Sequence, residues 1–475
     1  MHLFTIKKLA RLAAGCGLIA WAAAGWTQAL PPTVEEALQS AGIAADGVGI
    51  YVREVSAGAA LLELNAATAF NPASVMKLVT TDAALELLGP TYAWKTRAYG
   101  GGPQHGDVLQ GDLIIQGSGD PKLVLENFWL FLRRIRAQGI REISGKLVLD
   151  RSAFADSVHD AAAFDGEPGE PYNVGPDALL LNYKSIGLRF SPDAAGATVQ
   201  VSVDLPFAGF RVAAPALSNG NCGNWQDALG AQFSADGIVF NGAFPAACGA
   251  KTWYLSPYWI SDAEFFGKVF RQMWQELGGS FNGAVVDGRV PEDARLIAEW
   301  SSQALPEIVR DINKYSNNVM ARQVLLSLAP ELPPLPASTW RGAAAIRAWL
   351  AGKGIAAPEL VIENGSGLSR FERIAAGTLG RMLVAAFHAP TMPEFIGSLP
   401  LVGLDGTMRK RLQADGVAGQ AHIKSGSLDG VRSIAGYVLA ASGRRYVLVC
   451  LINDRNAARA RAVQDALLQW IYQNG

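Results

Sequence analysis

Ser74 is the only serine in the sequence that is followed by a lysine, Lys77, three residues later. Apolar residues around this pair recur at helical spacing, which predicts a helix with Asn71 as its N-cap, Pro72 in its first turn and Gly89 at its end. Residues three apart lie on one face of a helix, so the Ser74 hydroxyl and the Lys77 amine are expected side by side. A hydroxyl beside an amine at the positive end of a helix is a candidate activated nucleophile.

Two further short motifs carry groups that could complete such a site. Tyr315-Ser316-Asn317-Asn318 supplies a hydroxyl and an amide ahead of a predicted helix, although Ser280-Phe281-Asn282 also matches Ser-x-Asn by chance. Ile423-Lys424-Ser425-Gly426-Ser427 places a lysine and two hydroxyls at the end of a predicted strand, where Gly426 allows close approach of a ligand's backbone. Without a function, this last motif would be an exposed edge strand with a solvated lysine.

The elements that must bring these motifs together fall into two groups. Residues 30–97 and 290–475 combine helices with strands, whereas residues 98–289 carry short strands separated by Gly, Asp and Pro turns. Helices are predicted at 33–39, 71–88, 125–138, 305–312, 319–328, 342–352, 378–388 and 457–472, and strands at 48–52, 113–116, 146–150, 197–201, 431–439 and 445–452. The sequence therefore predicts a mixed α/β domain split by inserted domains, with a nested β-rich domain at about 172–255.

Composition excludes several classes of function. The 41 basic and 42 acidic residues nearly balance, so nothing indicates a nucleic acid partner. The five histidines are scattered and the sequence has no Gly-x-Ser-x-Gly, which argues against a Ser-His-Asp triad. No metal-ligand spacing occurs, and neither a metal nor a cofactor is predicted.

The N-terminal segment has the pattern of a signal peptide. A basic region containing Lys7, Lys8 and Arg11 precedes an apolar, Ala/Gly-rich stretch, and Thr27-Gln28-Ala29 forms a small-x-small cleavage site. We expect residues 1–29 to be removed near Ala29, leaving an exported protein with no stable membrane span. The alternative is an uncleaved anchor, but the apolar run is short for one.

Export gives meaning to the cysteines. Cys222 and Cys248 both lie in turn-like segments rich in small residues, and in an oxidising compartment these two are the expected disulfide pair. Cys450 lies within a continuous apolar run and is expected to be buried and reduced in a strand.

The three motifs, in this order, resemble the active-site set of penicillin-binding proteins and serine β-lactamases. Other stretches resemble the D-alanyl-D-alanine carboxypeptidase/endopeptidase family, the class C low-molecular-mass penicillin-binding proteins, over essentially the whole mature chain. These stretches are Gly117-Ser118-Gly119-Asp120-Pro121, Asn364-Gly365-Ser366-Gly367-Leu368-Ser369-Arg370, Gly403-Leu404-Asp405-Gly406-Thr407-Met408, Gly426-Ser427-Leu428-Asp429-Gly430-Val431 and Ala435-Gly436-Tyr437. One departure is Ser425, where threonine is commoner, although the hydroxyl is kept.

The resemblance implies a serine β-lactamase/transpeptidase-like domain of α/β class, with a sheet flanked by helices and a large β-rich insertion. It implies that Ser74 is the acylated nucleophile and Lys77 its general base. Ser316 would relay a proton to the leaving D-alanine, and Asn318 would orient the substrate amide and Lys77. A nearby cation and partial burial would independently lower the pKa of Lys77 from about 10.4 toward that of a useful base.

The same resemblance assigns substrate binding to the third motif. Lys424 and Ser425 would bind the terminal carboxylate beside Gly426, and the backbone N–H groups of Ser74 and Ser427 would form the oxyanion hole.

The implied substrates are peptidoglycan stem peptides in the periplasm, cleaved at terminal D-Ala-D-Ala and at D-Ala–diaminopimelate cross-links, with β-lactams as acylating inhibitors. Two alternatives share the motifs. A serine β-lactamase is disfavoured by the long insertion between Ser74 and Ser316, and a catalytically weak peptidoglycan-binding scaffold is disfavoured by the intact motif residues. The sequence leaves the oligomeric state open.

Overall fold

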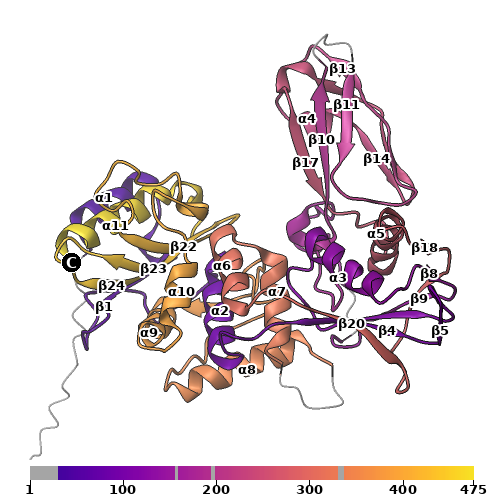
Figure 1. Ribbon diagram of the computed structural model, residues 1–475. Coiled ribbons are helices and arrows are strands. Elements are labelled where there is room, and N and C mark those ends of the chain that lie inside the picture. The colour runs from indigo at the N-terminus through magenta and orange to yellow at the C-terminus, as the bar shows by residue number, and fades with distance from the viewer. Residues whose placement is uncertain (1–29, 156–158, 194–197, 330–335) are drawn as a thin grey trace, which may run out of the picture.

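The computed structural model describes residues 30–155, 159–193, 198–329 and 336–475, so the predicted signal peptide lies outside the described residues. The chain forms two bodies that lie side by side, with a β-rich arm standing out from the second (Figure 1). We call the first body the core domain, and it consists of residues 30–94 and 302–475. We call the second body the insertion, and it is the intervening segment, residues 95–301.

The core domain is built on a five-stranded antiparallel sheet with the order β2-β1-β24-β23-β22. The central strand, β24, is nearly all buried because both faces of the sheet are covered. The strands are β1 Val48–Glu54, β2 Leu62–Leu64, β22 Ala421–Leu428, β23 Val431–Leu439 and β24 Arg445–Asn453, and a separate short pair consists of β3 Ala69–Phe70 and β21 Ile374–Ala375.

Helices cover both faces of this sheet (Figure 1). One face packs against α1 Pro32–Ala41 and α11 Arg461–Asn474, whose apolar sides share a hydrophobic cluster with the sheet. The other face packs against a group of helices that carries the first two motifs: α2 Met76–Leu87, α6 Leu305–Tyr315, α7 Asn318–Ser327, α8 Thr339–Gly352, α9 Ala376–Phe387 and α10 Met392–Ser398. The predicted α/β class, with an antiparallel sheet flanked by helices, is confirmed.

The insertion is built on a five-stranded sheet with the order β19-β9-β7-β4-β20 and a smaller sheet with the order β18-β8-β6-β5. Helices α3 Leu125–Ala137 and α5 Asp262–Glu276 share its hydrophobic cluster. The strands are β4 Lys95–Gly100, β5 Gln104–His105, β6 Val108–Leu109, β7 Leu113–Gly117, β8 Glu142–Ile143, β9 Leu147–Asp150, β18 Ser280–Phe281, β19 Val285–Asp287 and β20 Arg295–Ser301. Since β4 and β20 extend past the predicted limits of 98 and 289, we propose 95–301 as the bounds of the insertion.

The arm contains the strands between residues 186 and 255, inside the nested domain predicted at about 172–255. Its core is aromatic, with Phe190 stacked on Phe244 and Trp225 edge-on to both rings. Its elements are β10 Ile186–Pro192, β11 Val199–Val203, β12 Arg211–Val212, β13 Ala216–Ser218, α4 Trp225–Ala228, β14 Ala231–Ser234, β15 Gly237–Phe240, β16 Ala243–Pro245 and β17 Lys251–Leu255. Cys222 and Cys248 form the predicted disulfide in the arm, with Cα atoms 4.7 Å apart. As expected, Cys450 is free and buried.

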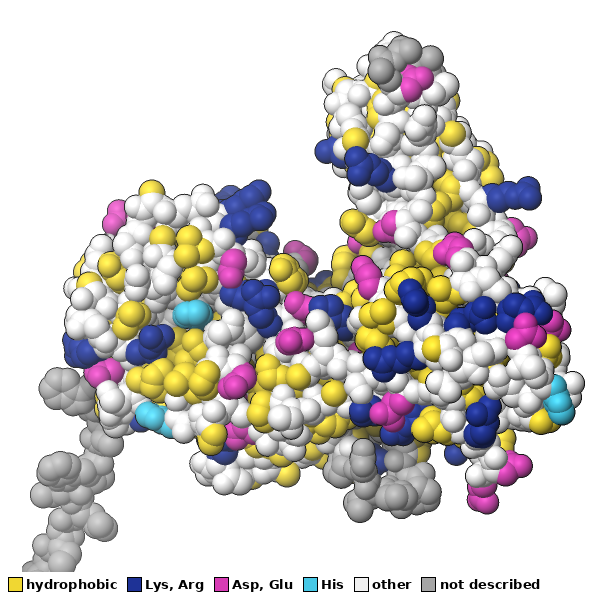
Figure 2. All heavy atoms as spheres, in the orientation of Figure 1, with side chains coloured by type: hydrophobic (Ala, Val, Ile, Leu, Met, Phe, Trp, Pro, Cys, Tyr) yellow, Lys and Arg dark blue, Asp and Glu magenta, His cyan; other side chains and the backbone are white. Residues whose placement is uncertain are grey.

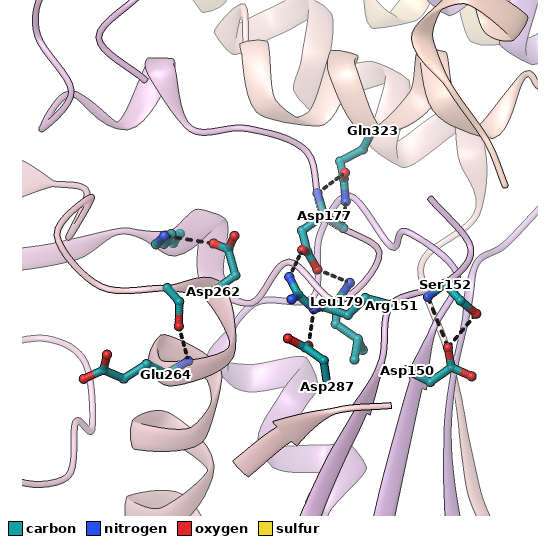
Figure 3. A network of polar contacts seen from close by, with 11 residues as sticks. Asp150, Arg151, Ser152, Asp177, Leu179, Asp262, Glu264, Asp287 and Gln323 are labelled. Atoms are coloured by element: carbon teal, nitrogen blue, oxygen red, sulfur yellow. Dashed lines mark hydrogen bonds and ion pairs between the residues drawn. The ribbon is translucent and has the colours of Figure 1, made fainter. Parts of the chain in front are cut away.

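A polar network fastens the insertion to α7 of the core domain (Figure 3). Arg151 donates to Asp177 at 2.5 Å and to Asp287 at 2.8 Å. The backbone N–H of Asp177 donates to Gln323 Oε1 at 3.0 Å, and Gln323 Nε2 donates back to the Asp177 carbonyl at 2.8 Å. Gln323 belongs to α7, whose first residue is Asn318, so the insertion braces the helix that begins at the second motif.

Neither sign of charge dominates the face shown in Figure 2, because Lys and Arg side chains lie among Asp and Glu side chains over the insertion. Within the described residues, every helix is too short or too polar to span a bilayer.

Asp82 is a buried carboxyl group in α2, and its side chain has no hydrogen-bond partner among the described residues. Burial, together with the nearby Glu86 carboxylate, raises the pKa of Asp82 well above its usual value. The native state therefore keeps a proton that the unfolded state releases above about pH 4, so this group lowers stability as pH rises toward its folded pKa.

Replacing Asp82 with asparagine removes that titration. We expect the difference in melting temperature, Asp82→Asn minus parent, to be a few degrees larger at about pH 7.5 than at about pH 4. Thermal unfolding at both pH values measures this difference, with Asp46→Asn on the surface as control. Parallel pH dependences in Asp82→Asn and the parent would contradict the assignment.

Candidate active site

The first motif begins with a tight turn rather than with the helix itself. Ala73–Val75 forms a 3₁₀ turn and α2 starts at Met76, so the prediction that the helix follows Asn71 directly is wrong. Asn71 is not the N-cap of α2, but its Oδ1 accepts the Ala73 N–H at 2.8 Å and so supports the turn. Ala73 has φ of +46°, a left-handed conformation that a non-glycine residue adopts only when its surroundings impose it.

Those surroundings are the central strands of the sheet. The Asn71 N–H donates to Asn453 Oδ1 at 2.7 Å, and Asn453 Nδ2 donates back to the Asn71 carbonyl at 2.9 Å. Ser433 Oγ donates to the Pro72 carbonyl at 2.5 Å. Strands β24 and β23 thereby fix the backbone that leads into Ser74.

Lys77 lies where three groups converge on its amine. Its Nζ is 3.0 Å from Ser74 Oγ and 2.6 Å from Asn318 Oδ1, and it also donates to the Ser366 carbonyl. The side chain is fully buried, whereas Ser74 is partly accessible. The expected proximity of Ser74 and Lys77 is confirmed.

The second motif occupies the junction of two helices. Ser316 ends α6 in a left-handed conformation with φ of +58°, and Asn317 caps α7 by accepting the Met320 N–H at 3.0 Å. This sharp turn directs Ser316 toward Lys424 and Asn318 toward Lys77. The chance match beginning at Ser280 lies instead in β18 of the insertion.

The third motif lies on β22, the edge strand of the core sheet. Lys424 is fully buried, and its Nζ donates to Ser316 Oγ at 2.9 Å and to the Ser425 carbonyl at 2.7 Å. The interpretation of Lys424 as a solvated lysine is therefore excluded. Ser425 Oγ lies 2.9 Å from Thr407 Oγ1, so two hydroxyls are paired at the residue whose carbonyl accepts from Lys424.

Gly426 explains how β22 approaches the nucleophile. A Cβ atom at this position would lie 2.5 Å from Ser433 Oγ, 2.8 Å from the Pro72 carbonyl oxygen and 2.9 Å from the Ser74 nitrogen. Only glycine fits there. The next residue, Ser427, has an exposed side chain and continues the strand.

The electrostatics of the two lysines differ in their causes. Burial lowers the pKa of Lys77 well below its usual value, and the positive charges of Lys424 and Arg322 lower it further, while the Glu372 carboxylate opposes the shift. Burial alone lowers the pKa of Lys424 to about 7. An amine with a lowered pKa next to a hydroxyl is the arrangement that general-base activation of a serine requires.

Sequence reasoning missed three groups that shape this site. Ser366 contacts Lys77 through its carbonyl, Thr407 pairs with Ser425, and Asn453 holds Asn71. The first two lie in stretches that the family resemblance singled out, 364–370 and 403–408, but no role was assigned to Ser366 or Thr407. Asn453 follows an apolar strand and carried no signal.

Among the described residues, two hydrogen-bonded sets make up the site. Lys77 joins Ser74 and Asn318, and Lys424 joins Ser316 and the carbonyl of Ser425, whose hydroxyl pairs with Thr407. Among those same residues, no group of three or more His, Cys, Asp or Glu side chains is placed to hold a metal ion. What the arrangement offers is a hydroxyl, an adjacent amine with a lowered pKa, and a second buried lysine.

Comparisons with known proteins agree with this chemistry. The family model of D-Ala-D-Ala carboxypeptidase 3 (S13) matches residues 30–474. The chain is 26% identical to the D-alanyl-D-alanine carboxypeptidase DacB of Haemophilus influenzae, over 86% of this chain and 85% of that protein. It is 28% identical to a D-alanyl-D-alanine carboxypeptidase of Actinomadura sp. strain R39, over 88% and 80% respectively.

The crystal structure of penicillin binding protein 4 from Haemophilus influenzae has the same fold. It superposes with a TM-score of 0.77 at 23% identity, and the match covers 93% of this chain and 99% of that one. The family match covers nearly every residue that the structure describes, including all the motif residues from Ser74 to Ser427. The protein therefore belongs to the D-Ala-D-Ala carboxypeptidase 3 (S13) family of serine-type peptidases.

Proposed function

We propose that this protein cleaves D-Ala-D-Ala termini of peptidoglycan stem peptides through an acyl-enzyme on Ser74. The observation that supports this most is the 3.0 Å contact between Ser74 Oγ and the buried Lys77 Nζ. Ser74 Oγ attacks the carbonyl carbon of the penultimate D-alanine while its proton passes to Lys77. The backbone N–H groups of Ser74 and Ser427 receive the negative charge that develops on the carbonyl oxygen.

Collapse of the tetrahedral intermediate breaks the C–N bond and leaves an ester on Ser74. Ser316, whose Oγ accepts a hydrogen bond from Lys424, relays a proton to the leaving amine of D-alanine, and water then hydrolyses the ester. Asn318 holds Lys77 and orients the substrate amide. These roles are supported by the contacts of Lys77 and Lys424 and by the family resemblance.

Carboxylate recognition is assigned to the third motif. The charged form of Lys424 offers a positive charge to a terminal carboxylate, and the Ser425–Thr407 pair, in which one hydroxyl donates to the other, offers one free O–H donor. Gly426 lets β22 approach the turn that carries Ser74, which keeps this carboxylate site close to the nucleophile. A substrate that ends in a free carboxylate fits this end of the site.

Cross-linked substrates are the second part of the proposal. A cavity of about 510 Å³ adjoins the 364–371 loop and is lined by Asp160, Arg322, Glu363 and Arg370, among others. Charges of both signs suit the free amino-acid end of diaminopimelate in a D-Ala–diaminopimelate cross-link. An endopeptidase acting on peptidoglycan works outside the cytoplasm, in agreement with the expected signal peptide and periplasmic location.

Mass spectrometry of the mature protein after reaction with penicillin tests the assignment. We expect one covalent adduct, on the peptide that contains Ser74, and an adduct on Ser316 would refute the proposed nucleophile. Hydrolysis of a labelled D-Ala-D-Ala peptide, compared with turnover of the β-lactam, separates the alternatives. Rapid β-lactam turnover without peptide cleavage identifies a β-lactamase, and neither reaction identifies a scaffold protein.

A further inference from the structure

Glu372 is a fully buried carboxylate that the proposed mechanism does not use. It lies beneath the turn formed by Glu363, Asn364 and Gly365. Its Oε1 accepts the backbone N–H groups of these residues at 3.1, 3.0 and 2.8 Å respectively. One oxygen of Glu372 therefore organises the start of the 364–370 loop.

This turn leads directly into the base. Gly365 is fixed to α2, because its carbonyl accepts a hydrogen bond from Thr80 Oγ1 at 2.7 Å. The next carbonyl, that of Ser366, contacts Lys77 Nζ. Moving the Glu372 carboxylate would displace the carbonyl that holds the amine.

The second oxygen of Glu372 has a different environment. Oε2 is buried and has no hydrogen-bond partner among the described residues, so hydrogen bonding to the turn accounts for only half of the carboxylate. Burial raises the pKa of Glu372, whereas the three backbone N–H groups and Lys77 lower it, so the carboxylate form depends on these partners. Two positive charges face Glu372, those of Lys77 from α2 and Arg322 from α7. Arg322 also faces Glu363, and Lys424 of β22 faces Lys77.

We propose that Glu372 is a positioning residue that fixes the Ser366 carbonyl against Lys77 and holds a negative charge opposite the ammonium formed when Lys77 accepts the Ser74 proton. The proposal rests on the proposed role of Lys77 as general base. Transfer of that proton places a new positive charge in a site that already contains Lys424 and Arg322. The carboxylate of Glu372 offsets this accumulation of charge.

Replacing Glu372 with glutamine tests the charge while keeping the geometry, because the amide oxygen can still accept the three N–H groups. The readout is the rate constant for acylation by a fluorescent penicillin, measured from mildly acidic to mildly alkaline pH. Loss of the carboxylate lets the pKa of Lys77 fall further, so the acidic limb of the profile is expected to move by roughly one pH unit to lower pH.

Two other variants complete the test. Glu372→Asp keeps the charge but shortens the side chain, and its acidic limb is expected to stay near that of the parent even if the rate falls. Glu359→Gln is the matched control, since Glu359 Oε1 also accepts a backbone N–H, from Ala375 at 3.2 Å, and a hydroxyl, from Thr378 at 2.6 Å. Its profile is expected to match the parent.

An unmoved acidic limb in folded Glu372→Gln would overturn the proposal and leave Glu372 a purely structural role. If Glu372→Gln does not fold, Glu372→Asp decides. An acidic limb that shifts to lower pH in this variant, although the charge is kept, would also overturn the proposal. These outcomes differ from failure of the proposed function, which would appear in the parent as the absence of an adduct on Ser74.

Discussion

Replacing Lys77 with arginine is expected to slow acylation by penicillin by about 10²–10⁴-fold, the range for loss of a general base. Lys77 is fully buried beside Ser74, and burial lowers its pKa well below the usual value, so it can lose its proton. Arginine keeps a positive charge and a similar length but stays protonated at any working pH. The variant would present a guanidinium group to Ser74, and this group has no free lone pair with which to accept the serine proton.

Stopped-flow or gel-based acylation by a fluorescent penicillin measures this loss. Lys95→Arg provides the matched control, because Lys95 is a partly exposed lysine of β4 that pairs with Glu299 at 3.0 Å, in the insertion rather than in the site. Melting temperatures near the parent's should accompany both variants. If Lys77→Arg acylates at close to the parent rate, the lysine acts only through its charge and a different base must activate Ser74.

Replacing Lys424 with methionine is expected to lower kcat/KM for a D-Ala-D-Ala peptide by roughly 10²-fold, since the charge-assisted bond to the substrate carboxylate is lost. The pH profile should change as well. Burial lowers the pKa of Lys424 to about 7, so in the parent the ammonium is present below that pH and is lost as pH rises through it. Lys77 must be neutral to accept the Ser74 proton, and Lys424 must be charged to bind the carboxylate. The plot of kcat/KM against pH for the parent is therefore bell-shaped, with its acidic limb set by Lys77 and its alkaline limb set by Lys424.

In Lys424→Met that alkaline limb should disappear. The acidic limb should move to higher pH, because Lys424 is one of the charges that lower the pKa of Lys77. Steady-state hydrolysis over the pH range measures both limbs, with Lys95→Met as control. An alkaline limb that persists unchanged would assign it to another group and remove Lys424 from carboxylate binding.

Local patterns predicted the parts of this site that depend on near neighbours in the chain. The spacing of Ser74 and Lys77 placed their side chains together because the backbone between them is helical, although the first turn proved to be 3₁₀. The hairpin of β23 and β24 and the disulfide between Cys222 and Cys248 also followed from local composition.

What the sequence could not give was burial imposed by distant segments. A lysine in an edge strand is ordinarily solvated, but Lys424 is buried and donates to Ser316, 108 residues earlier in the chain. Glu372 was missed for the same reason. Helix α5 was missed in spite of its Ser261 cap and its periodic apolar residues, because neighbouring turns and short strands dominated the interpretation of that region.

The order of strands in the core sheet has a consequence for how the protein is made. The centre of the sheet is β24, the last strand to leave the ribosome, and it pairs with β1, the first. The bond between Asn71 and Asn453 joins residues 382 positions apart, so the nucleophile's turn cannot be fixed until almost the whole chain has been synthesised. The insertion closes on itself earlier, since β4 and β20 pair within it. A chain that stops before Arg445 would thus contain the insertion and all three motifs, yet it would lack β24 and would have no hydrolase activity.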